Sequence, residues 1–423
     1  MRDWSPEQVA RAAGARLTGE DGTSGPIRAV IDSRHAGPGD LFVGLPGEQV
    51  DGGRFATQAL EQGAWGALVG EGHEGPGRRL LAADPLAALQ RLATAWRRAL
   101  GAQVVGITGS TGKTSTKDLV AAMVEQQRRV IATPANLNTE IGLPLTVLGA
   151  PSGTEVLVLE MAMRGRGQIA ELARIAEPDV GIIVNVGPVH LELLGTVEAI
   201  AATKAELLAG LPEGGTAIVP AGEPLLAPHL RADVRTVTFG PGGDVAELPH
   251  GLEIPFDSAH MQRNALAALA AARAVGVEPQ GRVEVALSEL RGQKLALPGD
   301  VVVINDCYNA NPMSMRAALD DLAVSATGRR VAVLGDMLEL GPDERRFHEE
   351  VGAHARACGV DLLVTVGPLA AAIDGAFGGE AHHVATAGEA APVLRELLRP
   401  GDTVLVKGSR GVGLEVVAEQ LAG

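Results

Sequence analysis

An apolar run that leads into a glycine-rich loop and then a helical pattern constrains this 423-residue chain more than any other feature. Residues 104–117 read Val-Val-Gly-Ile-Thr-Gly-Ser-Thr-Gly-Lys-Thr-Ser-Thr-Lys. The general phosphate-loop pattern is G-x-x-x-x-G-K-[ST], and this chain has Gly112-Lys113-Thr114 but Ile107 in place of the first glycine. Glycines let backbone N–H groups turn toward phosphate oxygens, and the helix N-terminus adds its dipole. The segment therefore predicts a nucleotide-binding strand–loop–helix unit.

Each side chain of this loop has an expected role. Lys113 is expected to reach the β- and γ-phosphates of ATP, and the Thr114 hydroxyl to bind Mg²⁺. The expected ATP contacts in the loop are Thr108, Gly109, Ser110, Thr111, Gly112, Lys113, Thr114 and Ser115. An ordinary glycine-rich turn is the alternative, and the Gly-Lys-Thr triplet between a strand and a helix disfavours it. The loop alone fits a kinase, a GTPase, a motor or a ligase.

Strand and helix patterns alternate along most of the chain and predict an α/β protein of three domains. Up to residue 84, short strands at Arg28–Ile31 and Leu41–Val43 lie among Gly/Pro turns. Residues 85–297 begin with a helix over about 85–99 and alternate strands and helices around the phosphate loop, which is typical of a mostly parallel sheet covered on both faces. Residues 298–423 repeat that pattern as a second doubly wound unit. The Gly/Pro-containing stretch Gly292–Asp300 is interpreted as a hinge. The predicted strands of the last two domains are 104–108, 155–160, 180–186, 216–219, 301–305, 330–334, 362–366 and 403–406.

Composition and charge bound the class of protein. Hydrophobic residues make up 46% of the chain and charged residues 21%, which is ordinary for a globular protein. No apolar run reaches the roughly 18 residues that a membrane span needs, and the first residues lack the apolar core of a signal peptide. Two cysteines imply no disulfide framework, so we expect a cytoplasmic location. The net charge of −15 argues against broad nucleic-acid binding.

Lysine, asparagine and tyrosine are rare and fall in few places. The chain has five lysines against 31 arginines, seven asparagines, which lie in four short segments, and one tyrosine, Tyr308. Lys113, Lys117, Lys204 and Lys407 all lie in segments with other candidate site residues, and Lys294 lies at the predicted hinge. We interpret this confinement as a sign that these residues serve chemistry rather than solvation.

Two strand ends beside the phosphate loop carry candidate metal ligands. Glu160 ends the run Val-Leu-Val-Leu-Glu, and a carboxylate at that edge is well placed for Mg²⁺. The next strand leads to His190, which by placement is about as plausible as a ligand as it is as a structural histidine. Thr196 is expected to cap the following helix, which carries Lys204 in the sequence Ala-Thr-Lys-Ala-Glu. On such a helix a lysine is normally exposed to solvent.

Together, the Thr-Gly-Ser-Thr-Gly-Lys-Thr loop, Glu160, His190 and the Ala-Thr-Lys204-Ala-Glu segment resemble the Mur ligases, the ATP-dependent amide ligases of peptidoglycan precursor synthesis. The resemblance implies that Lys113, His190 and Lys204 are catalytic. It implies a carbamylated Lys204, and a site for two Mg²⁺ ions formed by Thr114, Glu160, His190 and that carbamate. Burial of Lys204 would favour the neutral amine that reacts with CO₂.

Further segments extend the resemblance to the substrates. Asp32-Ser33-Arg34 through Gly47 resembles the UDP-sugar-binding domain of the family, which implies contacts from Ser33 and Arg34. The loop of Asn136, Asn138, Thr139 and Glu140 resembles a muropeptide-contacting loop, and Arg164 belongs to the loop after the Glu160 strand. His260–Asn264 resembles the helix beside adenine, which implies that Asn264 binds ATP; a helix-cap asparagine is the alternative.

The most discriminating segment is Asn305-Asp306-Cys307-Tyr308-Asn309-Ala310-Asn311-Pro312. It resembles family members that add D-alanyl-D-alanine, which implies ATP binding by Asn309 and substrate binding by Asp306, Tyr308, Asn311, Lys407 and Arg410. The family's Gly-Arg at the central/C-terminal junction is replaced here by Gly292-Gln293-Lys294.

This resemblance implies a concrete reaction. UDP-N-acetylmuramoyl-tripeptide and ATP would form an acyl phosphate, and D-alanyl-D-alanine would then attack it to give the pentapeptide. All partners would be small molecules, and we expect a monomer. The alternatives are the tripeptide-forming member, a folylpolyglutamate synthetase, or, in a different class, a nucleotide-hydrolysing switch. The Asp32–Arg34 segment disfavours the folate enzyme, and the Tyr308–Pro312 segment disfavours the tripeptide former.

Overall fold

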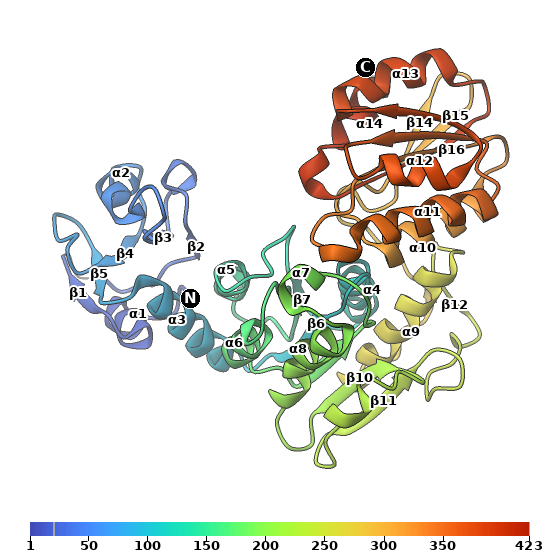
Figure 1. Ribbon diagram of the computed structural model, residues 1–423. Helices are drawn as coiled ribbons and strands as arrows, with labels where there is room; N and C mark the ends of the chain where they lie inside the picture. The colour runs from blue at the N-terminus through green and yellow to red at the C-terminus, as the bar shows by residue number, and fades with distance from the viewer. Residues whose placement is uncertain (20–21, 423) are drawn as a thin grey trace.

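A computed structural model of the chain describes residues 1–19 and 22–422. The chain forms three α/β units that follow one another along the sequence, each around its own main sheet (Figure 1). The N-terminal unit lies at one end, the central unit in the middle, and the C-terminal unit against the far side of the central one. Within the described residues, no helix is both long and apolar enough to cross a membrane.

The N-terminal unit contains a five-stranded sheet of very short strands. Only the β1–β5 pair is antiparallel, and the other neighbours are parallel. In sheet order the strands are β1 (Arg16–Thr18), β5 (Arg79–Ala82), β4 (Gly66–Gly70), β3 (Asp40–Val43) and β2 (Arg28–Val30), with helices α1 (Pro6–Ala13) and α2 (Ala56–Glu61) packed beside them. The edge strand β2 faces the central unit, because it contacts helix α5 (Gly142–Gly149).

Helix α3 (Pro85–Leu100) joins the first two units. Asp84 caps its start by accepting a hydrogen bond from the Ala87 N–H, and Gly101 ends it in the left-handed region. Its buried face carries Leu89, Leu92 and Trp96 into a core shared with both units. The N-terminal unit therefore packs firmly on the central one through this helix.

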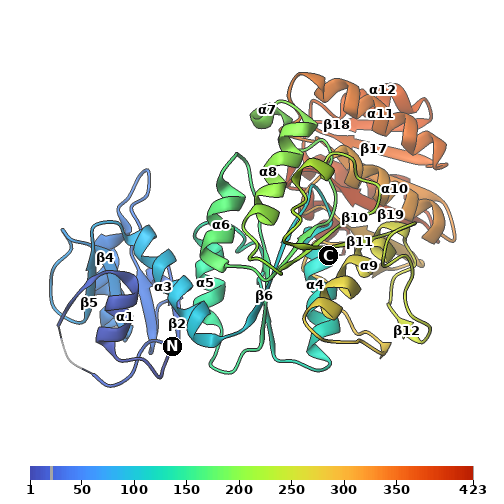
Figure 2. The ribbon, with the colours of Figure 1, turned by 90° about the horizontal axis from the view of Figure 1, so that it is seen from below.

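The central sheet has six strands, all parallel. In sheet order they are β11 (Arg235–Phe239), β10 (Thr216–Pro220), β9 (Val180–Ile183), β6 (Gln103–Thr108), β8 (Val156–Glu160) and β7 (Val130–Ala132). Helices α5, α6 (Gln168–Ala176) and α8 (Val197–Ala209) cover one face, and α4 (Lys113–Glu125) and α9 (Ala259–Ala274) cover the other (Figure 2). Burial on both faces explains why these strands are continuous apolar runs. A two-stranded ribbon, β12 (Leu252–Glu253) and β13 (Gly281–Arg282), flanks this sheet.

The C-terminal sheet also has six strands, parallel except for the pair β14–β15. In sheet order they are β14 (Gln293–Leu297), β15 (Val301–Asn305), β19 (Thr403–Lys407), β16 (Arg330–Gly335), β17 (Leu362–Val366) and β18 (Glu380–Val384). Helices α10 (Pro312–Ser325), α11 (Glu344–Ala357) and α12 (Ala371–Phe377) cover one face, and α13 (Ala387–Leu397) and α14 (Glu415–Ala422) the other.

Two sequence predictions need correction. The predicted hinge Gly292–Asp300 is mainly strand β14, because Leu295 and Leu297 pack against the core beneath β15. The chain instead turns just before it, where Leu290 and Gly292 have positive φ angles of 58° and 69°. The predicted strand 180–186 stops at Ile183, because the following residues leave the ladder to meet the phosphate loop.

Candidate active site

The phosphate loop lies between β6, in the middle of the central sheet, and α4. Gly109 and Gly112 are both required by their surroundings. A Cβ on Gly109 would lie 2.9 Å from the Val184 Cβ, and Gly112 has a φ of 76°. Ile107, which replaces the first glycine of the pattern, is part of β6 and completely buried. The departure from the pattern therefore falls in the strand and leaves the turn unchanged.

Residues after β9 hold the loop in place. The Thr111 N–H donates to Asn185 Oδ1 at 2.9 Å, and the Asn185 amide donates back to the Thr111 carbonyl at 3.1 Å. The Ser110 hydroxyl accepts from the Gly187 N–H at 2.9 Å and donates to the Gly187 carbonyl at 3.0 Å. Sequence reasoning noticed Asn185 only as one of the rare asparagines; here it fixes the loop's shape.

Two lysine amines are buried near the loop. Lys113 Nζ donates to the carbonyl of Gly109, in its own loop, at 2.9 Å. Burial lowers the pKa of Lys113, and the Glu160 carboxylate opposes that shift. Lys204 on α8 is 2% exposed, and burial lowers its pKa well below 10.5, with the charge of Lys113 adding to the effect. The surroundings of Lys204 therefore favour the neutral amine over the ammonium.

The carboxylate of Glu160 fits a cation. It ends β8, is 2% exposed, and accepts a hydrogen bond from the Asn138 amide at 2.8 Å through Oε1. Its other oxygen, Oε2, is buried with no hydrogen-bond partner among the described residues. A buried carboxylate oxygen is costly unless something binds it, and a divalent ion is a suitable partner.

His190 and Thr114 lie near the same amines. Burial lowers the pKa of His190, its contact with Glu339 opposes this, and the charges of Lys113 and Lys204 lower it further. The Thr114 hydroxyl accepts a hydrogen bond from the Arg291 guanidinium at 3.3 Å. Thr114, Glu160 and His190 offer hydroxyl, carboxylate and imidazole ligands, and this donor set fits Mg²⁺.

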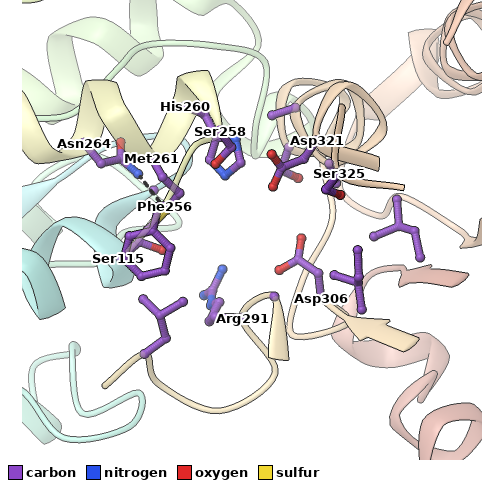
Figure 3. Close-up of a pocket in the computed structure, with 18 of the residues that line it drawn as sticks. Ser115, Phe256, Ser258, His260, Met261, Asn264, Arg291, Asp306, Asp321 and Ser325 are labelled. Carbon is purple, nitrogen blue, oxygen red and sulfur yellow. Dashed lines mark hydrogen bonds between the residues drawn. The ribbon is translucent and has the colours of Figure 1, made fainter. Parts of the chain in front are cut away.

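A cavity of about 450 Å³ opens between the loop and the C-terminal unit. In Figure 3 His260 and Asn264 of α9 face it from one side, and Asp306 and Asp321 from the other. Thr111, Gly112 and Ser115 reach the same cavity, and the Asn264 amide sits against Gly112. The cavity has the size and polarity of a small-ligand site.

Arg291 is the functional candidate that sequence reasoning missed. It lines this cavity, bonds the Thr114 hydroxyl, and its guanidinium stacks 4.1 Å from the centre of the Tyr308 ring. Arg291 precedes Gly292, whereas the family pattern has the arginine after the glycine. The family pattern therefore does not identify Arg291. Arg291 thereby links the Tyr308 ring to this cavity.

The remaining C-terminal candidates are engaged with the protein itself. Lys407 is 2% exposed, and its Nζ donates to Asp306 Oδ2 at 2.6 Å and to the Asn309 carbonyl at 3.0 Å. Asn311 caps α10 together with Ser314. Arg410 is exposed, 3.4 Å from the Glu415 carboxylate. Lys407 and Asn311 fix the shape of the 305–311 segment, and their contacts with substrate stay predictions.

The segments that carry the predicted substrate residues of the N-terminal and central units lie on two sides of one cavity. An open cavity of about 710 Å³ lies between the edge strand β2 and the region before and along α5. Asp32 and His35 line it from one side, and Pro134 and Leu137 from the other. Between Asp32 and His35, Ser33 is buried and bonds Gln58, while Arg34 is exposed and paired with Asp32 at 2.6 Å.

The connection before α5 contains Asn136, Asn138, Thr139 and Glu140, and the Asn138 amide donates to the Glu160 carboxylate at 2.8 Å. Arg164 lies after β8, with 76% of its side chain exposed and its guanidinium 3.9 Å from Glu339.

Comparison with known proteins agrees with this geometry. Residues 29–75 match the Mur ligase family catalytic domain, residues 107–272 the Mur ligase middle domain, and residues 281–410 the Mur ligase glutamate ligase domain. A UDP-N-acetylmuramoyl-tripeptide--D-alanyl-D-alanine ligase from Synechocystis is 40% identical over 92% of this chain and 90% of its own length. The ligase of that name from Escherichia coli is 32% identical over 98% and 97%.

Solved structures give the same result. MurF from Acinetobacter baumannii superposes with a TM-score of 0.89 at 29% identity, covering 99% of this chain and 98% of its own. MurF ligase from Thermotoga maritima, solved in complex with ADP, superposes with a TM-score of 0.83 at 30% identity, covering 93% and 97%. With the phosphate loop, the buried lysines and the three-unit architecture in place, this chain belongs to the Mur ligase family.

Proposed function

We propose that the chain joins D-alanyl-D-alanine to UDP-N-acetylmuramoyl-tripeptide and uses ATP to do so. The observation that carries this function is full-length similarity to ligases of that name, together with a phosphate loop that opens into a cavity shared with the C-terminal unit. The product would be the UDP-linked pentapeptide of peptidoglycan synthesis.

The reaction begins with two anions that repel each other. The terminal carboxylate of the tripeptide attacks the γ-phosphorus of ATP, ADP leaves, and an acyl phosphate forms. The amine of D-alanyl-D-alanine then attacks the acyl carbon, and phosphate leaves. Lys113 would turn from the Gly109 carbonyl toward the β- and γ-phosphates and balance their charge.

We infer that Thr114, Glu160, His190 and a carbamate on Lys204 would hold two Mg²⁺ ions, which would neutralise charge on the phosphates and the carboxylate. The support is the unpartnered Glu160 Oε2 and the buried Lys204 amine, whose pKa burial lowers. CO₂ adds to that amine with loss of one proton. The carbamate anion that results can bind a metal cation, whereas the ammonium form of lysine cannot.

The three units are proposed to divide the substrates. The cavity beside β2 would take the UDP-muramoyl part through Ser33 and Arg34, and Asn136–Glu140 and Arg164 would lie along the peptide. The nucleotide would lie between Asn264 and Asn309, with Asp306, Tyr308, Asn311, Lys407 and Arg410 on the D-alanyl-D-alanine side. Because β14 pairs with β15, we place the start of the third unit near Gly292, rather than at residue 298.

We also infer a monomer, because one chain supplies every candidate group. A cytoplasmic location is inferred from the proposed substrates, ATP and a UDP-linked precursor.

A product-mass assay tests the function. The protein is incubated with ATP, Mg²⁺, D-alanyl-D-alanine and UDP-muramoyl-tripeptides ending in lysine, ornithine or diaminopimelate. We expect a pentapeptide mass and one ADP per product with at least one tripeptide. ATP hydrolysis without any pentapeptide would instead support a nucleotide-hydrolysing switch and would contradict the proposed function.

A further inference from the structure

The C-terminal unit reaches into the candidate metal site through one carboxylate. Glu339 lies in the loop after β16, and its Oε2 is 2.5 Å from Nδ1 of His190, which follows β9 in the central unit. Its backbone carbonyl also accepts a hydrogen bond from the Glu192 N–H at 3.4 Å. The two units therefore meet at both the side chain and the backbone of Glu339.

Both partners adopt an unfavourable backbone conformation. Glu339 has a φ of 63° and His190 a φ of 52°, and they are two of six non-glycine residues with positive φ among those described. Glycine adopts this conformation freely, whereas a residue with a Cβ is retained there only when its surroundings hold it. Two such residues in contact with each other, from different units, indicate that the contact between their side chains matters.

The contact determines which nitrogen of His190 is free. An imidazole that donates Nδ1–H to a carboxylate keeps a lone pair on Nε2, and this pairing is usual for histidines that bind metals. His190 lies close enough to Lys113 and Lys204 for their charges to act on it. The other oxygen of Glu339 lies 3.9 Å from the guanidinium of Arg164, a largely exposed side chain.

We propose that Glu339 is a positioning residue for metal binding: from the C-terminal unit it orients the His190 ring and keeps Nε2 available as a ligand. This inference deepens the proposed function and rests on it. It means that the metal site is complete only when the loop after β16 is seated against the central unit.

Mn²⁺ affinity measured by electron paramagnetic resonance, with ADP present and no acceptor, tests this role. Glu339→Gln keeps the shape of the side chain but loses its charge. Glu339→Gly removes the side chain and relaxes the backbone, so a folding defect is not expected. His190→Ala shows the effect of losing the ligand itself, and Glu349→Gln, on the surface of α11 beside Arg345, is the matched control.

We expect the Mn²⁺ dissociation constant to rise about tenfold or more in Glu339→Gly, less in Glu339→Gln, and not at all in the control. ADP affinity without metal should stay within twofold. Unchanged Mn²⁺ affinity in either Glu339→Gly or His190→Ala overturns the proposal. Because the assay needs no ligation, its outcome is separate from a failure of the wild-type protein to form pentapeptide.

Discussion

Two lysines, Lys204 in the central unit and Lys407 in the C-terminal unit, are equally buried but differ in their partners. Each is 2% exposed. Lys407 is an ammonium that donates to Asp306 and to two backbone carbonyls. Among the described residues, Lys204 has no hydrogen-bond or ion-pair partner, and burial lowers its pKa well below 10.5. Lys407 thus lies among acceptors that bind its amine, whereas burial without such partners favours the neutral form of Lys204.

The largest expected effect concerns the lysine of the phosphate loop, which shares its surroundings with Lys204. Lys113→Ala should lower the rate of ligation by about a thousandfold, because it removes the cation that faces the transferred phosphate. The rate is measured from ADP release and pentapeptide mass. Normal turnover in a variant that folds as the wild type does would refute the phosphate-loop assignment.

Lys204→Met is expected to separate activity from stability. Ligation should fall at least about a hundredfold, because the carbamate ligand cannot form. Thermal unfolding without Mg²⁺ and bicarbonate should show that the variant is at least as stable as the wild type, because a buried amine is replaced by an apolar side chain of similar length.

The pH dependence of that stability difference follows from the lowered pKa. Between the folded-state pKa of Lys204 and 10.5, the unfolded chain binds more protons than the folded one, so wild-type stability rises with pH in that interval. As the pH rises through this interval toward 10.5, wild type should therefore gain stability relative to Lys204→Met. A constant difference would mean that the amine is not neutral in the folded protein.

Lys407→Met, in contrast to Lys204→Met, should lower the stability of the fold. It leaves the Asp306 carboxylate, 23% of whose side chain is exposed, without its cation, and unfolding free energy should fall by on the order of 2–3 kcal/mol. Denaturant unfolding measures this loss, and Lys294→Met on the exposed face of β14 is the matched control. If both variants lose equally little, Lys407 does not hold the 305–311 segment.

The smallest expected effect concerns Arg291. In Arg291→Lys the planar stack on Tyr308 and the bond to the Thr114 hydroxyl are lost, while the positive charge is kept. The KM for ATP should rise about five- to tenfold with little change in kcat, which corresponds to roughly 1 kcal/mol of binding. An unchanged KM would show that Arg291 does not contact the nucleotide.

Local patterns in the sequence predict much of this molecule. The phosphate loop, the two doubly wound units and the Thr196 cap of α8 follow from periodicity, glycine placement and capping residues. The rarity of lysine drew attention to Lys204, which the structure buries, and its role in the reaction stays a prediction. Strand β14 was mistaken for a hinge because Gly292 and Pro298 flank a strand whose inward leucines are few.

Contacts between units lie beyond such patterns. His190 and Glu339 are 149 positions apart, and they meet only because the C-terminal unit docks on the central one. Within the C-terminal unit, Lys407 and Asp306 are 101 positions apart and pair only because β15 and β19 are neighbours in the sheet. Pairings of this kind depend on how whole sheets are placed, which local propensity does not encode.

The dependence of ligation on CO₂ tests the central claim most directly, namely that Lys204 is a neutral amine that must become a carbamate. The rate of pentapeptide formation is measured in buffer depleted of CO₂ and then with bicarbonate restored. We expect the wild-type rate to fall on depletion and to recover with bicarbonate, with no response in Lys204→Met. Full activity in depleted buffer, with no carbamate carbon detected on the protein after incubation with ¹³C-bicarbonate, would contradict the account.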